Sequence, residues 1–236
     1  MSPPPRPGPF RHPRPAPATP PPEPPPPVPP APPDAARGLS PDGLALLDAY
    51  GRELATGGVI RGLIGPREVP RLWDRHLLNC AALGELIKPG ELVADIGTGA
   101  GLPGLVLALA RPDLRVILVE PLQRRCDFLV EMIRRFDLGK RVSVRRGKAN
   151  AVPPCQADVV TSRAVAALDE LAAWSLPHAR VGGRLLALKG QRAAEELAAA
   201  LPVLARWGAD ADAGVEPCGA AWLESPVLVV RATRRR

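Results

Sequence analysis

Apolar residues between positions 92 and 231 follow two alternating spacings, and these spacings predict the order of the secondary-structure elements. Short continuous apolar runs indicate buried strands, whereas apolar residues three and four positions apart indicate amphipathic helices. The predicted strands span 92–96, 116–120, 142–144, 158–161, 184–188 and 226–231. The predicted helices among them span 105–110, 122–137, 168–179 and about 191–206. Strands that alternate with helices predict an α/β fold with a mostly parallel sheet covered on both faces.

Two more helices are predicted before the first strand. Ser40-Pro41-Asp42 combines a capping hydroxyl, a proline at the first helical position and an early acid, so a helix is expected to begin there and to end at Gly57-Gly58. The second helix is predicted over 69–87. These helices form a helical cap at about 40–88, which precedes a core at about 91–232.

Proline is concentrated at the N-terminus, where residues 1–33 hold 19 of the chain's 32 prolines. A segment that is more than half proline lacks the backbone N–H donors that helices and sheets need. We therefore expect a disordered Pro-rich tail over 1–33. The remaining residues, 34–236, are enough for one folded domain with its own core.

Charge is also unevenly distributed. The whole chain carries a net charge of +7, but residues 34–230 carry only +1 and residues 111–148 carry +6. A basic zone on a nearly neutral body favours a polyanionic partner. An excess of 27 arginines over 4 lysines is equally typical of a GC-rich genome, so the charge alone leaves both interpretations open.

Several classes of protein are disfavoured by composition. No apolar run approaches the length of a membrane span, and the N-terminus lacks the apolar segment of a secretory signal. The four cysteines have neither CxxC nor metal-ligand spacing, and the three histidines are scattered. We expect a cytoplasmic protein with no membrane, metal or disulfide.

The clearest local motif is the glycine-rich segment 93–104, V-A-D-I-G-T-G-A-G-L-P-G, directly after the first predicted core strand. Glycines there let the backbone turn sharply and let a nucleotide approach it. Gly99, Gly101 and Gly104 satisfy the dinucleotide-binding pattern G-x-G-x-x-G. Asp95 at the strand end instead resembles the first motif of class I methyltransferases, which bind S-adenosylmethionine. Glu120, at the end of the next strand, suits the ribose of either cofactor.

The length of the chain favours the methyltransferase. About 70 residues follow Arg163, too few for the separate catalytic domain of a typical dehydrogenase. A class I methyltransferase needs no such domain, because its Rossmann-like sheet ends in an antiparallel strand, which 226–231 fits. A nicotinamide-dependent oxidoreductase, a small-molecule methyltransferase and a non-catalytic RNA-binding factor remain alternatives.

Several motifs, taken in order, resemble one family. They are W-D-R-H-L-L-N at 73–79, D-I-G-T-G-A-G-L-P-G at 95–104, V-E-P at 119–121, T-S-R-A at 161–164 and L-K-G at 188–190. Together they are similar to the bacterial glucose-inhibited division protein B family over about residues 40–232. The resemblance implies a methyltransferase that modifies ring nitrogen 7 of a guanine in the decoding-region loop of 16S rRNA. The implied partner is 16S rRNA or the small ribosomal subunit, and we expect a monomer.

The resemblance also implies the site residues. Arg163 is the expected catalytic residue, at the carboxyl end of the fourth strand. The expected cofactor-binding residues are Asp95, Gly97, Thr98, Gly99, Gly101, Leu102, Glu120, Ala149, Asn150 and Arg163. The expected substrate-binding residues are Arg75, His76, Arg124 and Lys189. Asn150 stands where the family has an acid, and its carbonyl oxygen can still accept a hydrogen bond from the adenine amino group.

The expected chemistry needs few groups. Guanine nitrogen 7 already carries an in-plane lone pair, so catalysis consists mainly of positioning for an in-line attack. Accordingly, no Asn-Pro-Pro-Tyr motif follows the fourth strand. Cys155 in Pro153-Pro154-Cys155 precedes that strand, so we interpret it as a loop cysteine and not as a nucleophile. His76 is equally compatible with simple packing, and Trp174 is expected to be part of the core or cap.

Overall fold

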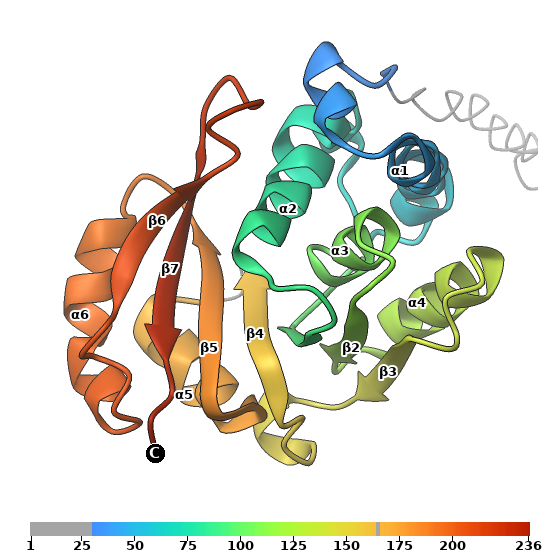
Figure 1. The fold of residues 1–236 in the computed structure, drawn as a ribbon. Helices are drawn as coiled ribbons and strands as arrows, with labels where there is room; N and C mark the ends of the chain where they lie inside the picture. The colour runs from blue at the N-terminus through green and yellow to red at the C-terminus, as the bar shows by residue number, and fades with distance from the viewer. Residues whose placement is uncertain (1–29, 164–165) are drawn as a thin grey trace, which may run out of the picture.

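The computed structural model describes residues 30–163 and 166–236, which form one seven-stranded sheet with helices on both faces (Figure 1). The strand order is β3-β2-β1-β4-β5-β7-β6. The strands are β1 (Leu92–Ile96), β2 (Arg115–Glu120), β3 (Val142–Arg146), β4 (Ala157–Arg163), β5 (Ala179–Lys189), β6 (Gly214–Cys218) and β7 (Val227–Thr233). Strands β1 to β5 pair in parallel, whereas β7 runs antiparallel to both β5 and β6.

The helices form two layers. The helical cap contains η1 (Asp34–Gly38), α1 (Pro41–Glu53), η2 (Leu54–Gly58), η3 (Pro66–Arg71), η4 (Leu72–Leu77), α2 (Leu78–Ala82) and η5 (Leu83–Leu86). The core adds α3 (Gly104–Ala110), α4 (Gln123–Arg135), η6 (Ala149–Ala151), α5 (Leu168–Ser175), η7 (Leu176–His178) and α6 (Ala193–Ala205). Helices α1 to α4 pack on one face of the sheet, and α5 and α6 pack on the other (Figure 1).

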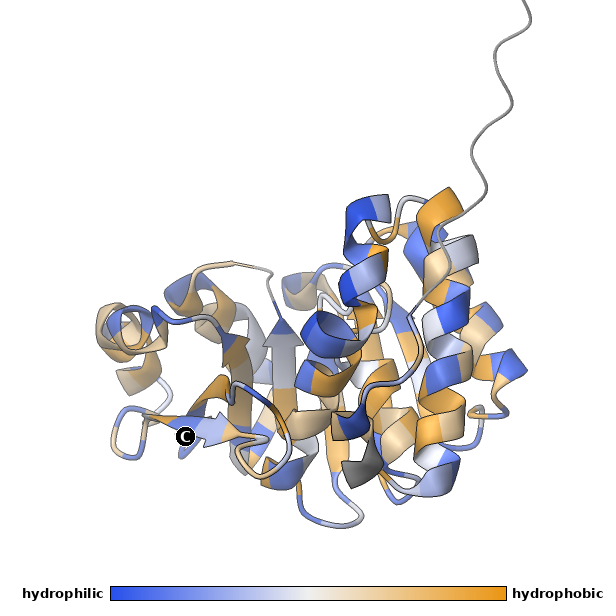
Figure 2. Cartoon of the chain, turned by 90° about the horizontal axis from the view of Figure 1, so that it is seen from above, coloured by the Kyte–Doolittle hydropathy of each residue, from blue (hydrophilic) through white to orange (hydrophobic). Residues whose placement is uncertain are grey.

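Strand β5 shows how the sheet separates two apolar cores. Leu186 belongs to the cluster under α1 to α4, whereas its neighbours Leu185 and Ala187 belong to the cluster under α5 and α6. This alternation follows from the two-residue period of a strand, and burial on both faces explains its continuous apolar sequence. Figure 2 shows hydrophobic residues gathered along the strands and hydrophilic residues toward the outer sides of the helices.

The first helix does not end at Gly57-Gly58, which corrects the prediction. Both glycines keep a helical backbone through η2, and the helix continues to Ile60. It ends at Gly62, which has a φ of 64°. There the N–H of Leu63 donates to Gly58 O at 2.8 Å and the N–H of Gly62 donates to Val59 O at 2.9 Å. This pair of bonds is the Schellman motif, so the glycine with positive φ marks the helix end.

Three other boundaries differ from the predictions. The helix expected over 69–87 is a continuous helical path that changes type from η3 through η4 and α2 to η5. The helix expected over 168–179 ends earlier, at Ser175, because Pro177 lacks the N–H that an α-helix requires. Strand β6 was not predicted, because Glu216 and Pro217 interrupt its apolar pattern, as an edge strand tolerates.

The domain boundaries remain expectations. The expected tail, 1–33, lies almost wholly outside the described residues. The first helical segment of the described chain is η1, in which Ala36 is fully buried. No helix within 30–163 or 166–236 is long and apolar enough to cross a bilayer.

Candidate functional site

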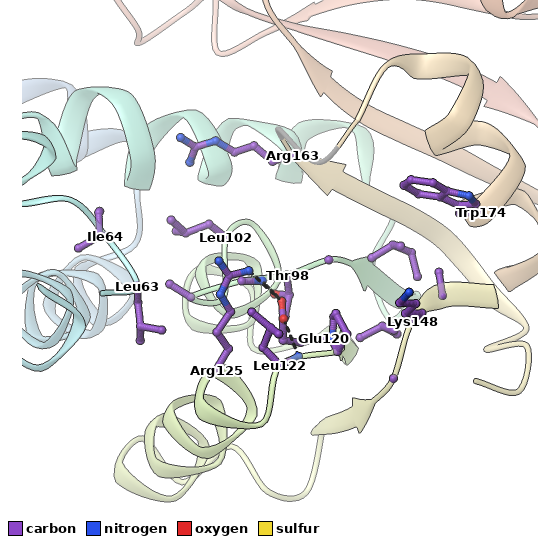
Figure 3. A pocket seen from close by; sticks show the side chains of 18 of the residues that line it. Leu63, Ile64, Thr98, Leu102, Glu120, Leu122, Arg125, Lys148, Arg163 and Trp174 are labelled. Atoms are coloured by element: carbon purple, nitrogen blue, oxygen red, sulfur yellow. Dashed lines mark hydrogen bonds and ion pairs between the residues drawn. The ribbon is translucent and has the colours of Figure 1, made fainter. Parts of the chain in front are cut away.

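A cavity of about 770 Å³ opens at the carboxyl ends of β1, β2 and β4 (Figure 3). The chain runs from β1 outward to β2 and β3, and then returns to the other side of β1 to form β4. In an open parallel sheet this switch point is where ligands bind. The volume lies in the range that small-molecule cofactors occupy, roughly 300–1,000 Å³.

Most of the cavity wall comes from the loops after β1, β2 and β3. These loops, together with the last residue of β2, the first turn of α4 and η6, contribute Gly97, Thr98, Gly99, Ala100, Leu102, Glu120, Pro121, Leu122, Arg125, Gly147, Lys148, Ala149 and Asn150. The rest of the wall comes from the helical cap, from the strands β1, β2 and β4, and from α5. These parts contribute Leu63, Ile64, His76, Ile96, Val119, Arg163 and Trp174.

The glycine loop, residues 97–104, depends on close backbone contacts. A Cβ on Gly104 would lie 2.4 Å from Leu118 Cδ2 and 2.8 Å from Asp95 Oδ2. Gly101 has a φ of 100°, and a Cβ there would lie 2.8 Å from the hydroxyl of Tyr50. That hydroxyl donates a hydrogen bond to Ala100 O. The loop therefore fits between β1 and α1 only with glycine at these two positions.

Asp95 supports this loop from below and does not line the cavity, although it was predicted to bind cofactor. Its carboxyl is fully buried, and Oδ2 accepts the N–H of Gly104 at 2.8 Å. Burial raises the pKa of Asp95 to about 7, and hydrogen bonds from the Thr98 side chain and the Gly104 N–H oppose that rise. The contact of Asp95 is thus with the N-terminus of α3, and a direct contact with cofactor remains a prediction.

Glu120 presents a carboxylate at the floor of the cavity. Its side chain is 1% exposed, and its two oxygens accept the N–H of Gly99 and the N–H of Leu122, each at 3.0 Å. Arg125 Nη1 lies 3.5 Å from Oε2. A carboxylate has about four lone-pair sites, so further donors such as ribose hydroxyls can still bind it.

Arg163 lies on the opposite side of the cavity, at the end of β4 (Figure 3). Its Nη2 lies 2.7 Å from Nδ1 of His76, and its Nη1 donates to Cys80 Sγ at 3.3 Å. Nε2 of His76 lies 2.8 Å from Glu68 Oε2. The tertiary structure thus brings β4 into contact with the helical cap, 87 residues away in sequence.

The predicted cofactor residues mostly surround this cavity. Gly97, Thr98, Gly99, Leu102, Glu120, Ala149, Asn150 and Arg163 all line it, whereas Gly101 and Asp95 do not. Asn150 is exposed at the rim, and Ala149 O accepts a hydrogen bond from His178. The roles predicted for these residues remain predictions.

The predicted substrate residues are less concentrated, since only His76 lines the cavity. Arg75 and Arg124 are exposed outside it. The side chain of Lys189 is 8% exposed and its Nζ binds Glu196 Oε2 at 2.8 Å and Ala166 O at 2.9 Å. An RNA phosphate would have to compete with these two partners, and the predicted RNA contact of Lys189 remains a prediction.

Eleven cavity residues were not among the predicted site residues: Leu63, Ile64, Ile96, Ala100, Val119, Pro121, Leu122, Arg125, Gly147, Lys148 and Trp174. Trp174 is 36% exposed and lines the cavity, so its assignment to the core or cap was wrong. Helix α5 brings it beside the loop after β3. Arg125 follows Arg124 directly, and only the helical phase of α4 shows which of the two faces the cavity.

The residues present fit a nucleoside cofactor with a polar end. Glu120 supplies acceptors for paired hydroxyls, and Leu122 and Ala149 supply an apolar slot beside it. Thr98 is 1% exposed and lines the cavity, and its hydroxyl interacts with the buried carboxyl of Asp95.

Known proteins resemble this chain in sequence. A family model described as rRNA small subunit methyltransferase G matches residues 44–206. The protein of that name from Salinispora tropica is 54% identical over 209 residues, which cover 86% of each chain. The corresponding protein from Mycobacterium sp. strain KMS is 55% identical over 206 residues, which cover 86% of this chain and 90% of that one.

Solved structures resemble the fold. A putative S-adenosyl-L-methionine-dependent methyltransferase from Methanococcus maripaludis matches with a TM-score of 0.54 and 14% identity, covering 83% of this chain and 94% of that one. A SAM-dependent methyltransferase from Aquifex aeolicus matches with a TM-score of 0.52 and 18% identity, covering 74% and 98%. The predicted fold class is therefore confirmed.

Proposed function

The chain belongs to the rRNA small subunit methyltransferase G family, and we propose that it methylates ring nitrogen 7 of a guanine in the decoding-region loop of 16S rRNA. S-adenosylmethionine is the methyl donor of this family. The single observation that carries the proposal is the juxtaposition across one cavity of the Glu120 carboxylate and the Arg163 guanidinium. Family membership decides against the nicotinamide-dependent oxidoreductase.

The glycine loop and Glu120 hold the cofactor. When bound, S-adenosylmethionine supplies an electrophilic methyl group on a sulfonium. Glu120 accepts hydrogen bonds from the ribose hydroxyls of the cofactor. Leu122 and Ala149 offer apolar contacts to the adenine ring. Asn150 at the rim accepts from the adenine amino group. Because the loop's backbone is held between Tyr50 and Asp95, this half of the site is preorganised.

Arg163 orients the target guanine. Nitrogen 7 attacks with its own lone pair, so no general base is required, and the enzyme contributes mainly alignment. The guanidinium is suited to donate to the guanine O6, which leaves nitrogen 7 free for the methyl group. His76, which contacts Arg163, does not compete with it as a second positive charge. Burial and the charge of Arg163 both lower the pKa of His76 and keep its imidazole neutral.

Exposed basic side chains near the cavity supply the RNA contact. Lys148 lines the rim of the cavity, and Arg124, Arg134, Lys140 and Arg146 are exposed on α4, on the loop before β3 and at the end of β3. Contacts of this kind release counterions from the phosphate backbone, so RNA binding should weaken steeply as salt rises. Binding that hardly changes between low and high salt would count against this surface. We also expect a monomer in the cytoplasm.

The test is transfer of a labelled methyl group to small ribosomal subunits and to naked 16S rRNA, followed by cleavage at methylated guanine. Incorporation at a single guanine is the expected result. Arg163→Ala should lower turnover by roughly 10²–10³-fold, the usual cost of removing a transition-state donor. Arg192→Ala removes an exposed arginine of the same charge near α6 and serves as the control. Unimpaired turnover by the Arg163 variant, or turnover on a small molecule without RNA, would refute the proposal.

A further inference from the structure

A continuous hydrogen-bonded chain runs from the surface of the helical cap to the cavity. Glu68 Oε2 lies 2.8 Å from His76 Nε2, and His76 Nδ1 lies 2.7 Å from Arg163 Nη2. The side chain of His76 is 11% exposed and that of Glu68 is 33% exposed, so the chain leads from a partly exposed carboxylate to a buried imidazole. A second contact, from Arg163 Nη1 to Cys80 Sγ at 3.3 Å, holds the other arm of the guanidinium.

The chemistry of the partners determines which imidazole nitrogen carries the hydrogen. Arginine only donates hydrogen bonds, so Nδ1 of His76 has to be the unprotonated acceptor. Nε2 then carries the hydrogen and donates it to the carboxylate of Glu68. Hydrogen bonding to His76 lowers the pKa of Glu68, so that carboxylate is ionised and acts only as an acceptor. Glu68 therefore selects the tautomer that Arg163 needs.

This arrangement excludes a role for His76 as general base. Its basic nitrogen is already bound by Arg163, and its other nitrogen is bound by Glu68. The guanidinium has five N–H donors, of which these two contacts use two. The remaining donors are available to a ligand in the cavity, and their direction is set by His76 and Cys80.

We propose that His76 is a positioning residue that aims the Arg163 guanidinium at the RNA base, with Glu68 setting its tautomer. The inference rests on the proposed function, because the base is the ligand of Arg163. In the sequence Arg75-His76 of the helical cap, it gives His76 a role other than direct RNA contact. Arg75 remains exposed, whereas His76 acts from within the fold.

Protonation of His76 would break this chain. Nδ1 would then carry a hydrogen, so two donors and two positive charges would face each other and the contact with Arg163 would be lost. Turnover should therefore fall as the pH drops through the pKa of His76. The charged and titratable groups around the imidazole are Glu68 on η3, Arg75 on η4, Cys80 on α2 and Arg163 on β4. Asp95 on β1 interacts electrostatically with Cys80 and with Arg163.

Two substitutions separate positioning from packing. His76→Asn can place a carbonyl oxygen where Nδ1 stands, because both atoms are two bonds from Cβ. His76→Gln reaches instead toward the position of Nε2. We expect kcat on rRNA to stay within about threefold for the asparagine variant and to fall about 10- to 100-fold for the glutamine variant, the effect of losing a bond to a charged group. Asp74→Asn, on the same helical segment but exposed, is the matched control.

The pH profile supplies a readout that packing would not move. The asparagine variant should lose the lower inflection of the wild-type kcat profile, which protonation of His76 causes. Equal kcat values for the two His76 variants, or a lower inflection that persists in the asparagine variant, would overturn the proposal. If the wild-type enzyme methylates no rRNA, the proposed function fails instead.

A measurement without turnover completes the test. Imidazole ¹⁵N–¹H correlation spectra of the full chain, assigned with single histidine variants, should show His76 as the neutral Nε2–H tautomer. In Arg163→Ala the pKa of His76 should rise, because the guanidinium charge lowers it in the wild type. A neutral Nδ1–H tautomer, or an unchanged pKa in that variant, would contradict the positioning role.

Discussion

The glycine loop and the helical cap line the same cavity but are built in different ways. The loop is held by backbone groups: Gly104 N–H binds Asp95, and Gly99 N–H binds Glu120. Their partners lie 9 and 21 residues away in sequence. The cap is held to the cavity by side chains, and the contact from His76 to Arg163 spans 87 residues.

This difference in construction corresponds to two tasks of the proposed reaction, binding of the cofactor and recognition of the RNA base. A cofactor that is common to many enzymes can be bound by backbone donors and one acidic side chain, which require a particular loop shape. A specific base requires side chains aimed from several directions, so its half of the site depends on how the helical cap packs onto the sheet. Substitutions in the loop should therefore affect folding and cofactor affinity, whereas those in the cap should affect turnover.

The largest difference between the glycine loop and the helical cap is expected when a methyl group is added to one glycine in each region. Gly104→Ala should lower the free energy of unfolding by about 2–3 kcal/mol, because its Cβ would lie 2.4 Å from Leu118 Cδ2 and 2.9 Å from Asp95 Cβ. Gly57→Ala, a helical position with open space around it, should be neutral or stabilise by up to about 1 kcal/mol. Urea unfolding of both variants measures this. Equal effects at the two glycines would remove the distinction.

A second comparison replaces one carboxylate in each region with its amide. Glu120→Gln should weaken S-adenosylmethionine binding by about 10- to 100-fold, because the amide NH₂ must face a backbone N–H of Gly99 or Leu122, donor against donor. Glu68→Gln should leave this affinity within about twofold, since the carboxylate lies in the cap and contacts His76. Titration calorimetry measures both constants. A Glu120 variant with native affinity would refute the ribose role.

The smallest expected effect concerns Tyr50, which joins the two regions. Tyr50→Phe removes the hydroxyl that donates to Ala100 O and should cost about 1 kcal/mol of unfolding free energy. Thr56→Ala removes an exposed hydroxyl that binds Arg52 O within the helix, and it should cost less. Thermal melting compares the two. A Tyr50 variant as stable as wild type would show that α1 does not support the glycine loop.

Much of the fold was predictable because local patterns reported it directly. Each predicted core strand corresponds to a strand of the sheet, since apolar runs such as 92–96 and 184–188 are buried on both faces. The errors occurred where local pattern and tertiary structure disagree. Gly57-Gly58 tolerates a helix because nothing forces positive φ there, and β6 forms by pairing with β7 although Glu216 and Pro217 interrupt its apolar pattern.

The residues of the candidate site likewise fall into those that the local sequence predicted and those that it did not. Gly97, Gly99 and Glu120 were found from their positions at the ends of two predicted strands, and they line the cavity. Trp174 and Arg125 were missed because nothing local distinguishes a tryptophan or arginine that faces a cavity from one that covers a core. The packing of α5 and the rotation of α4 decide where those two side chains point.

The amino-acid sequence alone was enough to predict the succession of strands and helices along the chain, the glycine loop after the first core strand and the acid that ends β2. Those features depend on residues close together in the chain, where periodicity and glycine conformation act. Only the tertiary structure decided that Lys189 binds Glu196, that Asp95 supports α3 and that His76 holds Arg163. Those contacts join residues on separate elements, and their energies depend on burial and on atomic distances that no local pattern encodes.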